Sequence, residues 1–307
     1  MDTEQIVDLI LREIQAFHPA ENMFAERNAS CPVDSVRESE HSLEPTTHRA
    51  SIIAPNEKPC KDFLCSDKLH ANNDTQTALL KHMQATTSAR IGIGKCGSRM
   101  RTATMLQFRA DHATAKDAVL RDVPEELLSQ LGLFTVQTLC ADHDEYLARP
   151  DLGRRFSRET LDIISQKCRH GTDVQIYAAG GLSSTAITSN LANILPVLTD
   201  GLKAMNLTLG DPFYVRFARV PSMEEISETL QPKVICVLIG ERPGLATAES
   251  MSAYLAYHAT VGMSESQRTV VSNIHKGGVS AVEAGAYLVE LIGKMVQKKT
   301  SGVDFAR

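Results

Sequence analysis

The strongest constraint on the fold is a regular alternation of strand and helix patterns in the second half of the chain. Short apolar or β-branched runs alternate with longer amphipathic stretches, and the most apolar run, 233–239, is typical of an interior parallel strand. This alternation predicts a mostly parallel sheet with right-handed crossovers, a Rossmann-like α/β fold. The expected strands are 134–140, 174–179, 213–220, 233–239, 251–258 and 269–274, and the expected helices are 100–120, 125–131, 185–205, 223–230 and 279–298.

The N-terminal part of the chain reads differently. Residues 2–18 place Ile6, Ile10 and Ile14 on one helical face, which predicts a short amphipathic helix that needs a partner to bury its stripe. Residues 19–90 mix charges with Ser, Thr and Pro without a sustained period, so we expect a disordered tether of low complexity. Such a helix is either a targeting signal that binds another protein or an N-terminal segment that packs on the core of its own chain. The predicted segments are 1–18, 19–90, a small helical arm at 91–125, and the Rossmann-like domain at 126–307.

Composition excludes several classes of protein. With 43% hydrophobic and 22% charged residues, the chain is too apolar to be wholly disordered. No apolar run reaches the roughly 18 residues that span a bilayer, the first residues do not form a signal peptide, and a net charge of −5 does not attract nucleic acid. Seven scattered cysteines indicate a reducing compartment, so we expect a cytoplasmic protein. Cys60, Cys65 and His70 lack a second pair of ligands, which argues against zinc.

A GxGxxG sequence at Gly92, Gly94 and Gly97 raises the possibility of a dinucleotide site. That fingerprint requires a hydrophobic strand directly before the glycines and a ribose-binding acid further along the chain. The preceding residues 84–90 are polar, and no later strand supplies the acid at the right spacing. A glycine-rich turn leading into a helix is therefore favoured, and a dinucleotide-binding α/β enzyme is the alternative.

Three turns follow expected strands, where open α/β sheets bind their ligands. In the turn 180–184, hydroxyl groups can also cap the next helix. In the turn 240–244, Glu241 and Arg242 come directly after a buried strand, so we expect them to hold a ligand, a partner or each other. His275 opens the third turn and is either titratable near neutrality or a structural hydrogen-bonding group.

A complete catalytic constellation is absent from the sequence. GxSxG, HExxH and the P-loop do not occur. His112 lies on an expected helix with Lys116 as its i,i+4 neighbour, a pattern typical of a charged docking face. These residues describe a ligand-binding α/β subunit rather than a self-sufficient enzyme. A scaffold that recruits partners through residues 2–18 without any ligand is a further hypothesis.

Several ordered motifs together resemble the light (small) chain of ethanolamine ammonia-lyase. The resemblance covers residues from about 90 to 307 and extends to Ala110-Asp-His112 and Lys116-Asp117. The motifs that carry it are 94–102 (GKCGSRMRT), 146–155 (YLARPDLGRR), 181–187 (GLSSTAI), 239–245 (IGERPGL), 272–278 (SNIHKGG) and 299–302 (KTSG).

The resemblance implies an adenosylcobalamin-dependent lyase that converts ethanolamine to acetaldehyde and ammonia. In that family a large chain with a TIM barrel holds the substrate. The small chain supplies a helical arm and a Rossmann-like domain that cover the cobalamin from its lower face, so it is not active alone. By motif, the corrin contacts fall on Val220, Glu241 and Val270, with no catalytic residue in this chain. The family usually has Cys at the position of Val270. A contact made through the backbone would survive that change, whereas a contact that needs sulfur would not.

The resemblance also bears on the form of the cofactor and on location. No His in the chain is preceded two residues earlier by Asp, so the DxHxxG motif of cobalamin domains that replace the lower base is absent. A base-on adenosylcobalamin, with its nucleotide tail in the α/β cleft, is consistent with this absence. Residues 2–18 resemble the amphipathic tags that direct this family's small chains into bacterial microcompartments. This implies docking on a shell protein, with a groove burying the apolar stripe.

Overall fold

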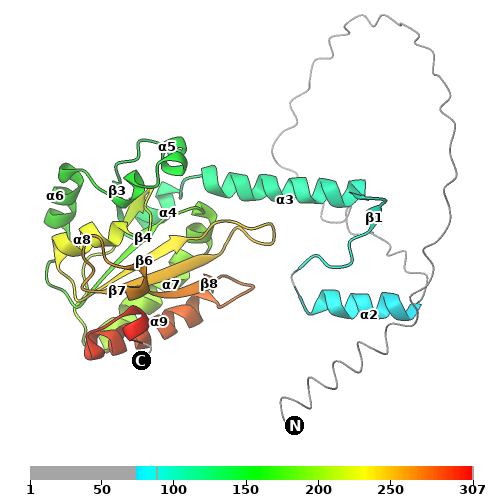
Figure 1. Ribbon diagram of the computed structural model, residues 1–307. Helices are drawn as coiled ribbons and strands as arrows, with labels where there is room; N and C mark the ends of the chain where they lie inside the picture. The colour runs from blue at the N-terminus through cyan, green and yellow to red at the C-terminus, as the bar shows by residue number, and fades with distance from the viewer. Residues whose placement is uncertain (1–73, 88, 306–307) are drawn as a thin grey trace, which may run out of the picture. The chain divides into compact units, whose positions relative to one another are not determined.

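The computed structural model describes residues 74–87 and 89–305 (Figure 1). The chain divides into two units, and all of these residues belong to the second, Pro59–Arg307. The amphipathic helix expected at 1–18, most of the tether expected at 19–90, and the pair Cys60 and Cys65 lie outside the described residues.

A six-stranded sheet forms the centre of this unit, with its strands in the order β3-β5-β4-β6-β7-β8. The first four strands in that order pair in parallel, while β6 with β7 and β7 with β8 pair antiparallel. The predicted mixed α/β fold with a mostly parallel sheet is confirmed. The strands are β3 (Phe134–Gln137), β4 (Val174–Ala179), β5 (Phe213–Arg216), β6 (Val234–Gly240), β7 (Met251–Tyr257) and β8 (Thr269–Ile274).

The antiparallel end of the sheet follows from its connections. A parallel neighbour requires a crossover of a dozen or more residues, usually a helix. The loop 241–250 contains no helix, and the link from β7 to β8 contains only the short 3-10 helix η2 (Glu265–Gln267). These two strands therefore return beside their predecessors as hairpins.

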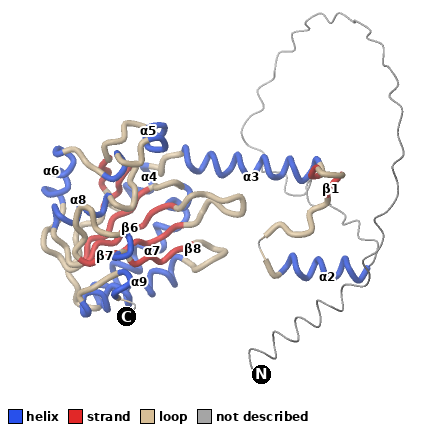
Figure 2. Tube along the Cα trace, viewed as in Figure 1, coloured by secondary structure: helices blue, strands red, loops and turns tan. Residues whose placement is uncertain are grey.

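Helices cover the two faces of the sheet (Figures 1 and 2). α7 (Ser184–Ala204) and α9 (Ala281–Lys298) contribute to a first hydrophobic core. α6 (Arg158–Lys167) and α8 (Ser222–Leu230) contribute to a second core on the opposite face. Every residue of β4 and β6 is buried, because these interior strands are covered on both sides.

Serine caps fix where the main helices begin. The Ser183 side chain accepts from Ala186 N–H at the start of α7, which confirms the predicted capping role of the turn 180–184. Ser280 and Glu283 form a reciprocal capping box at the start of α9. Each cap satisfies backbone N–H groups that a helix leaves without an intrahelical partner.

The remaining elements correct several sequence-based boundaries. A helix, α2, occupies part of the range 19–90 in which no period was expected, and α5 and α6 were not predicted at all. β5 ends at Arg216 rather than at 220, because Phe217 adopts a left-handed conformation with φ 58° that a strand cannot continue through. The elements not yet given are α2 (Asp74–Ala85), β1 (Lys95–Cys96), β2 (Arg99–Met100), α3 (Thr102–Leu120), α4 (Glu125–Gln130), α5 (His143–Ala148), η1 (Leu152–Arg154) and η3 (Gly302–Asp304).

In the part of the chain that the structure describes, no helix is both long enough and apolar enough to cross a bilayer.

Candidate functional site

Three loops meet at the edge of the sheet where the parallel strands end: 180–183 after β4, 217–221 after β5 and 241–250 after β6. β4 leads into α7 on the first core, whereas its neighbour β5 leads into α8 on the second core. Connections that diverge to opposite faces mark the point where open α/β sheets bind ligands. This edge is therefore the candidate site.

Glycines allow the first and third loops to approach each other closely. Leu182 N–H donates to Gly240 O at 3.0 Å. A Cβ added to Gly240 would lie 2.0 Å from Ser183 O, and one added to Gly181 would lie 2.3 Å from Gly240 O. Because these obstacles are backbone atoms, only glycine fits at either position. The two loops are thus fixed against each other.

Hydrogen bonds hold the loop 241–250 to α7 and its N-cap residue, and another joins the two ends of the loop. Ser183 Oγ donates to Ala248 O at 2.5 Å, and Asn190 Nδ2 donates to Glu249 O at 2.9 Å. Glu241 N–H donates to Ser250 O at 3.0 Å. The backbone that carries Glu241 is therefore held in place from both sides.

The loop after β5, which carries Val220, rests on the motif at 146–155. Tyr146 Oη donates to Ala218 O at 3.1 Å, and Arg219 N–H donates to Gly153 O at 2.7 Å. The Arg219 guanidinium lies 4.2 Å from the centre of the Tyr146 ring and donates to Tyr146 O at 2.8 Å. Val220 packs, partly buried, against the second core. Neither Arg219 nor the supporting role of Tyr146 was predicted from the sequence.

Glu241 and Val270 are brought together through a tyrosine that the sequence analysis missed. Tyr254 Oη donates to Glu241 Oε1 at 3.1 Å. On β8, Val270 is the direct cross-strand partner of Tyr254, so their side chains share one face of the sheet. Val270 remains 49% exposed. Tyr254 and Val220 both pack against the second core, so all three predicted site residues lie on this face.

Burial and charge keep the Tyr254 hydroxyl protonated. Burial and, second to it, the neighbouring Glu241 carboxylate together raise its pKa to about 12. The hydroxyl therefore donates to the carboxylate throughout the physiological pH range. Among the described residues no hydrogen bond reaches Glu241 Oε2, so the second carboxylate oxygen can accept from a ligand.

Two of the open questions about charged turn residues can be answered. No ion pair within 74–87 and 89–305 joins Glu241 to Arg242, so the alternative of mutual pairing is wrong. His275 makes local hydrogen bonds: its Nδ1 accepts from Gly277 N–H at 3.0 Å, and its Nε2 lies 2.8 Å from Asn273 Oδ1. This confirms the structural role for His275.

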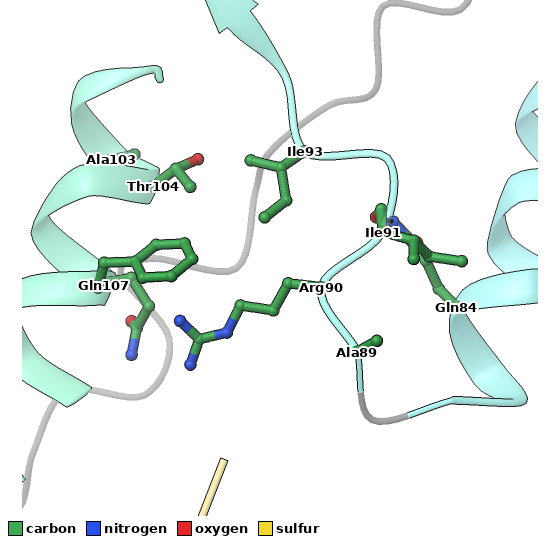
Figure 3. A pocket seen from close by; sticks show the side chains of 9 residues that line it. Gln84, Ala89, Arg90, Ile91, Ile93, Ala103, Thr104 and Gln107 are labelled. Atoms are coloured by element: carbon green, nitrogen blue, oxygen red, sulfur yellow. Dashed lines mark hydrogen bonds between the residues drawn. The ribbon is translucent and has the colours of Figure 1, made fainter. Parts of the chain in front are cut away.

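The GxGxxG sequence does not build a dinucleotide site. Gly97 lies in the hairpin of β1 and β2, which form a separate two-stranded sheet, and α3 begins only after that hairpin. The turn therefore leads into a hairpin rather than directly into a helix. A pocket of about 270 Å³ lies beside Gly92, and Figure 3 shows Arg90 extending from its wall toward Gln107. Arg90 is already paired with Asp111 and stacked on Phe108, so it is not free to hold a pyrophosphate.

The described residues form no metal-binding cluster, and two of their buried cysteines are unreactive. They contain no cluster of three or more His, Cys, Asp or Glu side chains that could hold a metal ion. Burial raises the pKa of Cys168 and of Cys236 to about 12, so neither thiol forms a nucleophilic thiolate at neutral pH.

Comparisons with known proteins agree on one family. The sequence model described as "Ethanolamine ammonia-lyase light chain" matches residues 77–306. The chain is 55% identical over 222 residues to a protein of Clostridium tetani named ethanolamine ammonia-lyase small subunit, covering 72% of this chain and 75% of the relative. Proteins of the same name from Clostridium perfringens and Clostridioides difficile are 51% and 46% identical, covering 77% and 84% of this chain and 80% and 90% of their own lengths.

Proposed function

The chain belongs to the ethanolamine ammonia-lyase light-chain family, and from this we propose that it is the subunit that encloses adenosylcobalamin against a large subunit. The assembled enzyme converts ethanolamine to acetaldehyde and ammonia. Its relatives are named "small subunit", which supports the existence of a larger partner chain. The large subunit holds the substrate in this proposal, and the present chain binds and orients the cofactor.

Glu241 and Val270 together fit a corrinoid. A corrin ring has a broad apolar face and a rim of amide groups that donate hydrogen bonds. Val270 offers exposed apolar surface, and Glu241 offers a carboxylate oxygen that no described residue uses. The observation that carries the proposal is the link from Glu241 through Tyr254 to Val270, because it places an acceptor and an apolar contact on one face.

When bound, adenosylcobalamin supplies the radical chemistry that cleaves the carbon–nitrogen bond. The contribution of this chain is to bind, orient and exclude water. We propose that Glu241 accepts from amide groups at the corrin rim, while Val220 and Val270 cover apolar parts of the ring. At Val270 the contact does not need sulfur, so valine can serve where the family usually has Cys.

The wider assembly is also part of the proposal. The arm at 91–125 contains α3, whose Met105 and Leu106 are exposed, and this apolar surface supports contact with the large subunit. The domain at 126–307 is proposed as a Rossmann-like cap in which a base-on cofactor lies at the carboxyl edge of the sheet. Residues 2–18 are proposed to dock on a microcompartment shell protein in the cytoplasm, and their amphipathic sequence pattern supports this.

Replacement of Glu241 tests the proposed cofactor contact. In the complex co-purified with the large subunit, Glu241→Ala should weaken cobalamin binding by about 1–3 kcal/mol, the value of a hydrogen bond to a charged group. This corresponds to a roughly five- to 150-fold increase in Kd, measured by titrating the cobalamin absorption spectrum.

The matched control is Glu249→Ala, which removes a carboxylate from the same loop but keeps the backbone carbonyl that Asn190 binds. It should leave the affinity unchanged. Equal affinities of wild type and Glu241→Ala would contradict the proposed contact.

The proposed division of labour has its own test. The purified chain should release no acetaldehyde from ethanolamine with adenosylcobalamin, and addition of the large subunit should restore release. Activity of this chain alone would overturn the assignment of the substrate to the partner.

A further inference from the structure

Tyr254 is the side chain that orients Glu241. The Glu241 backbone is fixed by its bond to Ser250 O, but its side chain has only one hydrogen-bond partner among the described residues, the Tyr254 hydroxyl at 3.1 Å. A glutamate side chain with a fixed backbone still has several rotamers, and one directional bond selects among them.

The Tyr254 ring is itself held firmly. It lies on β7 between its cross-strand partners Val237 of β6 and Val270 of β8, and it packs against the second core. The charged groups that act on its hydroxyl are Glu241, Glu265 and Arg268. Arg268 is committed to a buried ion pair with Glu224 of α8, so it does not compete with Tyr254 for Glu241. The ring therefore has one well-defined position from which to donate.

We propose that Tyr254 is a positioning residue of the cofactor site: its hydroxyl holds one oxygen of Glu241 so that the other faces an amide donor of the ligand. This inference rests on the proposed function, because it assigns a purpose to Glu241 at the corrin rim. It extends that proposal by adding a residue that acts on the ligand only through another side chain. The raised pKa of Tyr254 supports the role, since the donor persists at every physiological pH.

A double-mutant cycle separates positioning from simple packing. Tyr254→Phe keeps the ring and removes only the hydroxyl, so the strand pairing remains. In the complex with the large subunit, we expect it to raise the Kd for cobalamin about three- to tenfold, the usual effect of losing one hydrogen bond. In the Glu241→Ala background, the same change should raise Kd less than about 1.5-fold, because the group it positions is already gone.

Tyr257→Phe is the matched control. Tyr257 lies on the same strand and packs on the first core, on the opposite face of the sheet. Removal of the Tyr257 hydroxyl should not change the affinity of the complex for cobalamin. Thermal melting of all variants reports whether the fold is kept.

The possible outcomes distinguish this inference from the proposed function. If Glu241→Ala weakens binding and Tyr254→Phe does not, the positioning role is wrong and the cofactor contact stands. If Tyr254→Phe weakens binding equally in both backgrounds, the tyrosine acts through packing and the positioning role is again wrong. If Glu241→Ala has no effect, the cofactor contact itself fails.

Discussion

The contact between the first and third site loops makes Gly240 a sensitive position to test. An alanine Cβ there would lie 2.0 Å from Ser183 O and 2.4 Å from Gly180 O. Real Cβ contacts are essentially never shorter than 3.0 Å, so Ser183 O would have to move by at least 1 Å. That movement would also strain the hydrogen bond from Leu182 N–H to Gly240 O.

The cost of Gly240→Ala can be worked from this geometry. Overpacking a well-packed interior typically costs about 1–3 kcal/mol, and here the obstacles are backbone atoms that cannot choose another rotamer. Replacing glycine by alanine also reduces the entropy of the unfolded chain, which stabilises by about 0.4–1 kcal/mol. Gly244→Ala shares that gain but meets no atom closer than 3.9 Å. The difference between the two variants therefore isolates the clash.

Thermal unfolding followed by circular dichroism measures the effect. With roughly 2–4 °C lost per kcal/mol in a chain of this size, Gly240→Ala should melt about 2–12 °C below Gly244→Ala. Gly244→Ala should match or slightly exceed the wild type. If the two variants melt at the same temperature, the close approach of the loops at 180–183 and 240 is not the constraint that we infer.

Three further predictions concern stability. Ser280→Ala should destabilise by about 1 kcal/mol, because it removes the capping box of α9, and chemical denaturation measures this loss. Arg268→Met should destabilise by about 3–5 kcal/mol by leaving Glu224 buried without its partner, and a melting temperature equal to wild type would contradict this. Burial alone would raise the pKa of Asp173, but hydrogen bonds led by Lys233 lower it to about 2. Because this folded-state pKa is below the ordinary 3.8, the stabilisation is present above about pH 4 and lost toward pH 2. Asp173→Asn should therefore melt below wild type at pH 6, and the gap should close as the pH approaches 2.

Some elements could be predicted from sequence because their signals are local. The strands at Val174–Ala179 and Thr269–Ile274 have the predicted bounds, since short β-branched runs flanked by turn residues are recognisable without context. α5 and α6 were not predicted, although the capping side chains of Asp142 and Ser157 mark where they begin. The early end of β5 depends on the left-handed Phe217, a conformation that its neighbours impose and that its own residue type does not favour.

The candidate site likewise contains one residue that could be predicted from local sequence and others that could not. Glu241 was predicted because a charged residue directly after a buried strand is visible in the sequence. Tyr254 was not, because it lies thirteen residues further along the chain and meets Glu241 only through the β6–β7 hairpin. Likewise, Tyr146 supports the loop of Val220 across a separation of 72 residues to Ala218. Such partners carry no spacing signal.

The family, the α/β class and the turns at the carboxyl ends of the strands could be inferred from the amino-acid sequence, because periodicity and ordered motifs are properties of neighbouring residues. Three features became visible only in three dimensions: the last two strands run antiparallel, the backbones of 180–183 and Gly240 are in contact, and Glu241, Tyr254 and Val270 share one face. These features depend on strand order and register, which arise from packing between segments that are distant in the chain.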